Sequence, residues 1–181
     1  MRSSGERGEP WFTALYAAYH PHVVKYALRR LADLDASVDL AQDVFVVAWR
    51  RRAQVPDPGL PWLYGVARRL LANQWRARRA APTILPLVTG GAGHDLSADP
   101  AGQGAADRLG EVRAALARLP DLDQEILRLI GWEELTLAEA AIALGCRRTT
   151  AAVRLHRARR RLAEAIRQVP VGRSSTASIR A

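Results

Sequence analysis

A stretch rich in glycine and proline divides this chain into two halves. In residues 80–106 these two residue types interrupt any regular hydrophobic period. On either side apolar residues recur three and four positions apart, and neither half shows a sustained alternation of apolar and polar residues. The sequence therefore predicts an all-α protein, made of two small helical domains joined by a flexible linker.

The length of 181 residues is sufficient for two such domains. We expect the first domain to span residues 11–79 and the second to span residues 107–168, with residues 80–106 as the linker. Residues 1–10 and 169–181 are expected to be disordered, since short polar ends of a chain are rarely held in place.

Three helices are expected in the first domain. The first carries an apolar stripe from Phe12 to Leu31 and should kink or restart at Pro21. Ser37 is expected to cap the second, and after a loop at residues 54–59 Pro61 suits the first position of the third, which would run to about Arg79. The buried face of the second helix would comprise Leu40, Ala41, Val44, Phe45 and Ala48.

Four helices are expected in the second domain. Pro120 would end the first of them, and Asp121 would cap the next, whose buried side would comprise Leu122, Ile126, Leu129 and Ile130. A capping box, Thr136 to Glu139, opens a short helix that stops at Gly145 and is followed by a longer basic helix. This succession is typical of a helix-turn-helix.

The faces of the last helix separate by residue type. Its buried face would hold Ala151, Leu155, Ala158, Leu162 and Ile166, whereas Thr150, Arg154, Arg157 and Arg161 form an opposing stripe. The residues at the start of such a helix can reach base edges in a DNA major groove, while later arginines hold phosphates.

The charge of +9 is concentrated in two blocks, and 26 of the 27 basic residues are arginine. Residues 50–79 and 145–167 each hold eight arginines and one acid, whereas residues 107–144 hold four arginines and eight acids. Two separate basic blocks are typical of a nucleic-acid-binding protein with two contact surfaces.

The sequence contains no motif that predicts catalysis, a metal site or a cofactor. It lacks a P-loop, a dinucleotide fingerprint and a nucleophile elbow, and its four histidines are dispersed. A single cysteine, Cys146, favours a reducing compartment. Without a signal-peptide core or a long apolar run, we expect a cytoplasmic protein that is not inserted into a membrane.

Three motifs in order resemble the extracytoplasmic-function (ECF) group of bacterial RNA polymerase sigma factors, which carry only regions 2 and 4. Residues 39–49, DLAQDVFVVAW, resemble region 2.2, and residues 61–76, PWLYGVARRLLANQWR, are similar to the helix of regions 2.3 and 2.4. Residues 154–159, RLHRAR, resemble the end of the region 4 recognition helix.

This resemblance implies an alternative sigma factor that binds core RNA polymerase and promoter DNA, under the control of an anti-sigma factor. The implied polymerase contacts are Asp39, Gln42, Asp43 and Val46. The implied −10 contacts are Arg51, Arg52, Gln54, Asp57, Arg68, Asn73, Arg76 and Arg79. The implied −35 contacts are Arg147, Arg148, Thr149, Thr150, Arg154, Arg157 and Arg161.

An alternative interpretation of the same recognition helix is a helix-turn-helix regulator that binds its own operator and never joins polymerase. Such a regulator would carry a ligand pocket or a dimerisation helix in its first half. This chain has there an acidic helix and an arginine-rich helix separated by a short loop.

Overall fold

Seven α-helices make up the computed structural model, which describes residues 7–80 and 103–168, except for the side chains at 78–80 and 103–109; no strand occurs in these ranges. The first half contains α1 (Glu9–Leu31), α2 (Leu34–Arg50), a 3₁₀ turn η1 (Arg52–Gln54) and α3 (Leu60–Ala80). The second half contains α4 (Gln103–Ala117), α5 (Asp121–Gly131), α6 (Leu137–Leu144) and α7 (Arg148–Arg167). The all-α prediction is confirmed.

The helix ends extend beyond the segments expected from sequence. Helix α1 begins at Glu9, within the predicted disordered N-terminus, and α4 begins at Gln103, within the predicted linker. The predicted tail, residues 169–181, and most of the predicted linker lie outside the described residues.

Of the two outcomes expected at Pro21, a kink or a restart, the restart does not occur, because α1 continues through this residue. A proline inside a helix removes one backbone hydrogen bond. Here the apolar side chains on either side of it hold the helix in place, since Leu15, Val23 and Tyr26 are all buried.

The start of α2 is capped by Asp33, whose side chain accepts a hydrogen bond from the Ala36 N–H at 3.0 Å. The prediction that Ser37 is the cap was wrong. Ser37 lies one turn into the helix, where it is buried and donates to the carbonyl oxygen of Asp33. The predicted buried face of α2 is confirmed in full: Leu40, Ala41, Val44, Phe45 and Ala48.

Helix α5 differs most from its prediction. Its N-cap is Pro120 without a side-chain cap, so Asp121 does not play the expected role, and Leu122 is 42% exposed rather than buried. Asp123 and Glu125 are buried instead. Their charges have partners on other helices, as described below.

The helix-turn-helix is formed by α6 and α7. Thr136 and Glu139 make the predicted capping box, and Gly145 ends α6 with a φ of 66°, a left-handed conformation that glycine adopts without strain. Ala151, Leu155 and Ala158 are buried as expected, whereas Ile166 is exposed and Ala165 is buried in its place.

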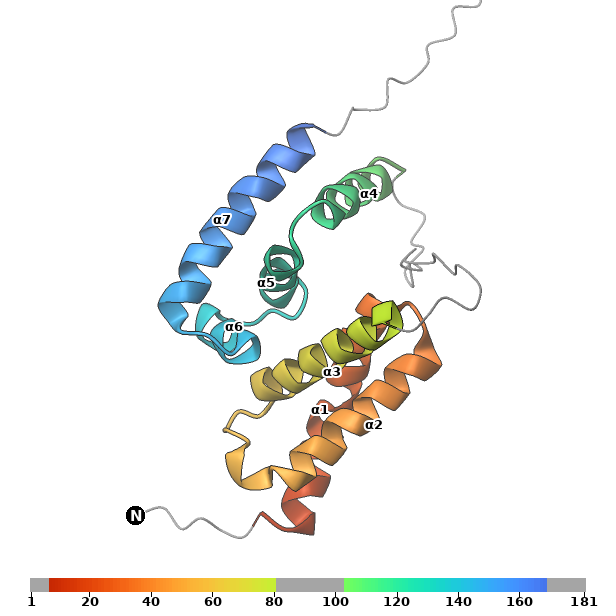
Figure 1. The fold of residues 1–181 in the computed structure, drawn as a ribbon, viewed down its shortest axis with the longest axis vertical. Coiled ribbons are helices and arrows are strands. Elements are labelled where there is room, and N and C mark those ends of the chain that lie inside the picture. The colour runs from red at the N-terminus through yellow and green to blue at the C-terminus, as the bar shows by residue number, and fades with distance from the viewer. Residues whose placement is uncertain (1–6, 81–102, 169–181) are drawn as a thin grey trace, which may run out of the picture.

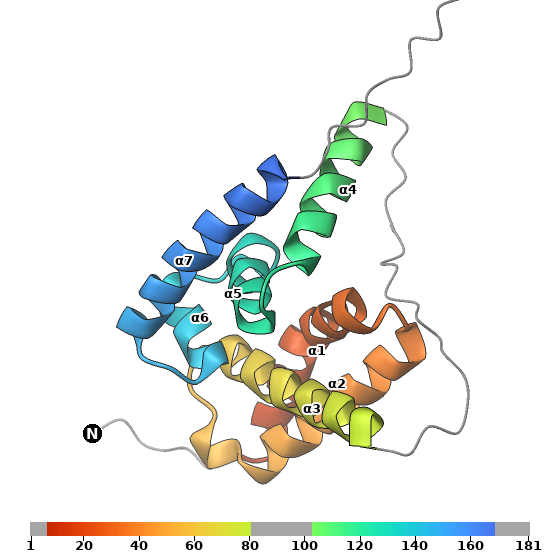
Figure 2. The same cartoon turned by 45° about the horizontal axis from the view of Figure 1, so that its top comes forward.

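The two halves pack against each other. Figures 1 and 2 show α5 and α6 lying between α7 and the group of α1, α2 and α3, with α6 beside the start of α3. One continuous apolar core joins residues of both halves, including Tyr26, Leu63, Ile126, Leu129 and Ala140. A smaller core lies between α4 and α7 and consists of Ala115, Leu116, Leu119 and Ala165.

The capping box gives a test of local stability. Thr136→Ala should lower the free energy of unfolding by about 1 kcal/mol, because the mutation leaves the Glu139 N–H without its side-chain partner. Chemical denaturation followed by circular dichroism measures this change. Thr13→Ala, at an exposed position inside α1, is the control and should cause no loss.

The same box should show a pH dependence. The Thr136 hydroxyl donates to the Glu139 carboxylate and is the main cause of the lowered pKa of that carboxyl. The Thr136 backbone N–H also donates to the carboxylate and lowers the pKa further. This stabilisation is present above the ordinary carboxyl pKa and is lost as the pH falls through the lowered one. The difference in free energy of unfolding between wild type and Thr136→Ala should therefore become smaller at strongly acidic pH. A difference that does not change with pH would contradict this account.

Candidate nucleic-acid interface

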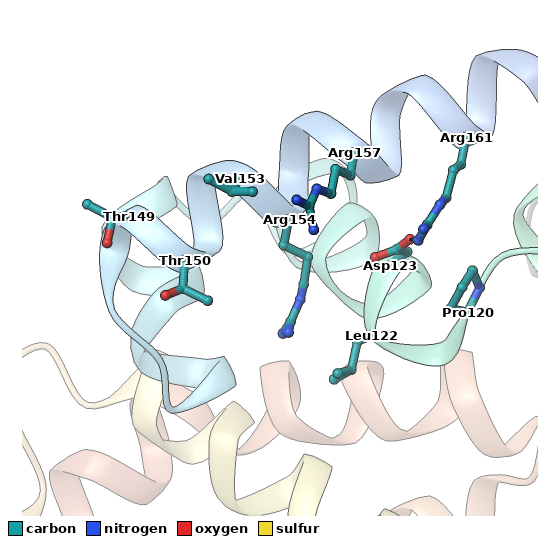
Figure 3. A pocket seen from close by; sticks show the side chains of 9 residues that line it. All are labelled: Pro120, Leu122, Asp123, Thr149, Thr150, Val153, Arg154, Arg157 and Arg161. Atoms are coloured by element: carbon teal, nitrogen blue, oxygen red, sulfur yellow. Dashed lines mark hydrogen bonds and ion pairs between the residues drawn. The ribbon is translucent and has the colours of Figure 1, made fainter.

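The stripe of α7 predicted from sequence lines an open groove between α7 and the start of α5. Figure 3 shows the side chains that form it, with Arg154, Arg157 and Arg161 on α7, Leu122 and Asp123 on α5, and Pro120 just before α5. Thr149, Thr150 and Val153 complete the lining, and the groove has a volume of about 540 Å³. The apolar face of α7 packs on the core, which leaves this basic side directed away from it.

One arginine of the stripe already has a partner. Arg161 donates a hydrogen bond to the buried carboxylate of Asp123, although more than half of the Arg161 side chain is exposed. Arg161 thus connects α7 to α5 and is less available to DNA phosphates than Arg157. The sequence did not show this pair, because Asp123 lies 38 positions away on a face expected to be solvated.

The start of α7 presents four exposed polar side chains: Arg147, Arg148, Thr149 and Thr150. Arg147 occupies the N-cap position but makes no side-chain capping bond. These residues directly follow the turn at Gly145 and form the N-terminal end of the second helix of the helix-turn-helix. Such a position allows side chains to enter a major groove ahead of the helix body.

The predicted −10 residues fall into two groups. Arg51, Arg52, Gln54 and Asp57 are exposed in the segment between α2 and α3, where Asp57 precedes a cis proline. Arg7 donates to the backbone carbonyls of Arg52 and Val55 and so fixes this segment to the start of α1. Sequence reasoning did not identify this role of Arg7.

The second group lies on α3. Asn73 and Arg76 are exposed and bonded to each other one turn apart. Arg68 is only partly exposed, since it donates to the carbonyl oxygens of Ala143 at 3.4 Å and Leu144 at 3.2 Å. The side chain of Arg79 lies outside the described residues.

The predicted polymerase contacts lie together on the outer face of α2. Asp39, Gln42, Asp43 and Val46 are all exposed, and Val46 is 47% exposed. Trp49, one turn beyond Val46, is 39% exposed and lies under the guanidinium of Arg52 at 4.9 Å. Trp49 was not among the contacts predicted from sequence, although its spacing of three from Val46 places both side chains on one face.

Neither a cluster of metal-ligating side chains nor a membrane-spanning helix is found in the part of the chain that the structure describes. No three His, Cys, Asp or Glu side chains there lie close enough together to hold a metal ion. None of the helices in residues 7–80 and 103–168 is long and apolar enough to cross a bilayer.

Two family models match this chain. Residues 15–81 match the model described as Sigma-70 region 2, and residues 109–162 match the model described as Sigma-70, region 4. The first covers most of α1 and all of α2 and α3, and the second covers α5, α6 and most of α7.

Several curated proteins are similar over most of this chain. The ECF RNA polymerase sigma factor EcfG of Rhodopseudomonas palustris is 31% identical, covering 78% of this chain and 77% of the relative. SigF of Caulobacter vibrioides, also an ECF RNA polymerase sigma factor, is 32% identical over 79% of this chain and 78% of the relative. The probable RNA polymerase sigma factor RfaY of Xanthomonas campestris is 36% identical, but this chain spans only 36% of its length.

Two solved structures share the fold. The sigma factor RpoE of Bartonella quintana, in complex with the anti-sigma factor NepR, aligns with a TM-score of 0.60 and 24% identity over 89% of this chain and 99% of the other. CnrH, in complex with the cytosolic domain of CnrY, aligns with a TM-score of 0.54 and 22% identity over 87% of this chain and 88% of the other.

The pair between Asp123 and Arg161 can be tested with a double-mutant cycle. Asp123→Ala and Arg161→Ala should show a coupling energy of about 0.5 kcal/mol, because water screens a pair in which one partner is largely exposed. Urea unfolding measures the coupling. Arg157→Ala serves as the matched partner in a second cycle and should not couple to Asp123; equal coupling in both cycles would contradict the assignment.

Proposed function

This chain belongs to the ECF RNA polymerase sigma factors, and we propose that it joins core RNA polymerase and directs it to promoters through specific residues of α2, α3 and α7. The main observation in support of this proposal is that one chain carries an exposed acidic face on α2 and two basic surfaces, one on α3 and one on α7. An operator-binding regulator would not require the acidic face.

The outer face of α2 is proposed to dock on core polymerase. Asp39, Gln42 and Asp43 supply hydrogen-bond acceptors and negative charge, and Val46 supplies apolar area beside them. Charged contacts of this kind guide association and orientation, while an exposed apolar side chain adds area that is buried on binding.

The segment between α2 and α3 is proposed to hold a base of the −10 element that has left the duplex, with Asn73 and Arg76 holding the strand. Arginines that follow the backbone are typical of single-strand binding. Arg7 would support this segment, because its hydrogen bonds to the backbone carbonyls of Arg52 and Val55 hold the segment in place.

The start of α7 is proposed to read the −35 duplex. Arg147, Arg148, Thr149 and Thr150 would contact base edges, and Arg154 and Arg157 would hold phosphates. The ion pair with Asp123 gives Arg161 a supporting role in this arrangement.

We further propose that the protein acts by binding without catalysing a reaction of its own, in the cytoplasm where polymerase and promoters meet. Membership of a family of transcription initiation factors supports this. Control by an anti-sigma factor is part of the proposal, because the structure of RpoE, which has the same fold, is a complex with the anti-sigma factor NepR.

The first test concerns α2. Asp39→Lys and Asp43→Lys should each weaken binding to core polymerase by about tenfold, equivalent to about 1.4 kcal/mol, because each reverses an exposed charge within the proposed contact. Co-elution and a titration with labelled protein measure the affinity. Asp35→Lys makes the same charge change on the first turn of α2 and should bind as wild type does.

Equal weakening by the three substitutions would show only a general charge effect. Undiminished binding by Asp39→Lys and Asp43→Lys would remove α2 from the interface. Transcripts started by core polymerase with the wild-type chain would still report whether the chain acts as a sigma factor, so the two questions are separable.

The second test concerns α7. Arg147→Ala or Arg148→Ala should reduce discrimination at individual −35 positions by about 1–3 kcal/mol if a bidentate guanine contact is lost. Arg157→Ala should weaken all sequences alike and lower the slope of log affinity against log salt by about 0.9 for each phosphate contact removed. Arg161→Ala should change that slope less, because Asp123 already neutralises the side chain.

Binding of holoenzyme to promoter fragments with single-base changes, across a salt series, measures both effects. Uniform weakening by every arginine substitution, with no change in base preference, would leave α7 as an electrostatic clamp without a role in readout.

A further inference from the structure

A buried group of charged and aromatic side chains joins the two halves of the chain. This interdomain lock consists of Tyr26 and Arg30 on α1, with Glu125 on α5 and Glu133 just after it. The Tyr26 hydroxyl donates to Glu125 at 2.7 Å, and Arg30 donates to both oxygens of Glu125 at 3.1 and 3.2 Å. Arg30 also reaches Glu133 at 3.2 Å.

The lock is almost fully shielded from water. The side chains of Arg30 and Glu133 are 1% and 3% exposed, and that of Glu125 is 10% exposed. The Arg30 guanidinium lies 3.4 Å from the ring centre of Tyr26, which in turn stacks on Tyr64 of α3 at 4.8 Å. Arg29 adds a further bond to Glu133 at 2.8 Å.

Every charge of the lock has its partner in the other half. Burial alone would lower the pKa of Arg30, but Tyr26, Glu125 and Glu133 raise it, so the guanidinium stays charged. Removing one member of a buried ion pair leaves the other charge without compensation, which makes such groups sensitive to any change in geometry. The lock therefore favours one relative position of the halves over nearby alternatives.

A second contact, between α3 and α6, depends on the absence of a side chain. A Cβ placed on Gly65 would lie 3.0 Å from the carbonyl oxygen of Ala143, closer than such atoms normally approach. This close approach lets Arg68 donate to the carbonyl oxygens at the end of α6. A residue proposed from sequence to contact the −10 element is thus bonded to the helix-turn-helix instead.

This arrangement cannot span a promoter. Elements centred near −10 and −35 are separated by about 25 base pairs, or about 85 Å at 3.4 Å per base pair. Compact domains of about 70 residues have radii of gyration of about 11 Å, so two of them in contact together span less than about 60 Å. The halves must separate before α3 and α7 can reach both elements.

The outer face of α2 is open in the same arrangement. Asp39, Gln42, Asp43 and Val46 are exposed, and none of them belongs to the lock. The contact between the halves therefore engages Arg68, which was predicted from sequence to contact the promoter, while leaving the proposed polymerase face accessible.

We propose that the chain by itself closes on the interdomain lock and the Gly65 contact, and that this closed state withholds promoter binding until the two halves are pulled apart. The closed state needs no inhibitor to form it, since all the contacts that hold it belong to this chain. The consequence for promoters rests on the proposed function, whereas the closure itself does not.

Two substitutions disrupt the closed state by independent routes. Arg30→Ala leaves Glu125 and Glu133 buried without their shared cation, and both carboxylates regain water when the halves separate. Gly65→Ala inserts a methyl group against Ala143, while alanine favours the helical conformation of α3 itself.

Each substitution has a matched control. Arg50→Ala removes an arginine from the last turn of α2, as Arg30→Ala does from the last turn of α1, but Arg50 is exposed and lies outside the lock. Gly110→Ala adds a methyl group to another helical glycine, which has no neighbouring atom within 4 Å of the new Cβ.

Small-angle X-ray scattering of the isolated full chain measures the closure. The wild type and both controls should have the same radius of gyration, and Arg30→Ala and Gly65→Ala should have larger ones with unchanged helix content by circular dichroism. An extended wild type, or wild-type dimensions in both lock variants, would overturn the proposal. If Arg30→Ala loses helix content, the radius of gyration of Gly65→Ala alone tests the proposal.

Promoter binding by the reconstituted holoenzyme measures the consequence. If the closed state outnumbers the open one tenfold, Gly65→Ala should raise the apparent affinity for promoter DNA at limiting protein by up to about tenfold over Gly110→Ala. Equal affinities, in variants shown by scattering to differ in dimensions, would overturn the withholding role. Absence of promoter-dependent transcripts from every variant, including wild type, would instead contradict the proposed function.

Discussion

The arrangement of the whole molecule depends on the carboxylate of Glu125, which α5 carries into the contact between the two halves. A buried carboxylate is costly unless hydrogen-bond donors surround it. Its donors, Tyr26 and Arg30, come from α1, so α5 can sit in its place only when α1 is beside it. The shared apolar core around Ile126 and Leu129 then follows from the same juxtaposition.

Features that arise from neighbouring residues were predicted correctly. The buried face of α2, the capping box at Thr136 and the turn at Gly145 each involve contacts within about two helical turns. The spacing of residue types along the chain records such contacts directly. For the same reason the exposure of Asp39, Gln42, Asp43 and Val46 agrees with the pattern, although their binding roles remain predictions.

Features that arise from distant residues were missed. Glu125 bonds to Arg30 across 95 positions, and Asp123 bonds to Arg161 across 38, so no local pattern marks either acid as buried. The pairing also changes which side of α5 is buried, which explains why Leu122 is exposed against expectation. At α2 the error was smaller and local, because the observed cap, Asp33, lies only four residues before the predicted one, Ser37.

The close approach at Gly65 has a consequence for how this chain can diverge. A larger residue at position 65 requires the backbone of Ala143 to withdraw, and withdrawal would lengthen the bonds from Arg68 to the end of α6. A larger residue at this point of α3 would therefore need a compensating change on α6, even though the two helices belong to regions that match separate family models. Exchanging one region for that of another sigma factor would join surfaces that had never been selected to fit.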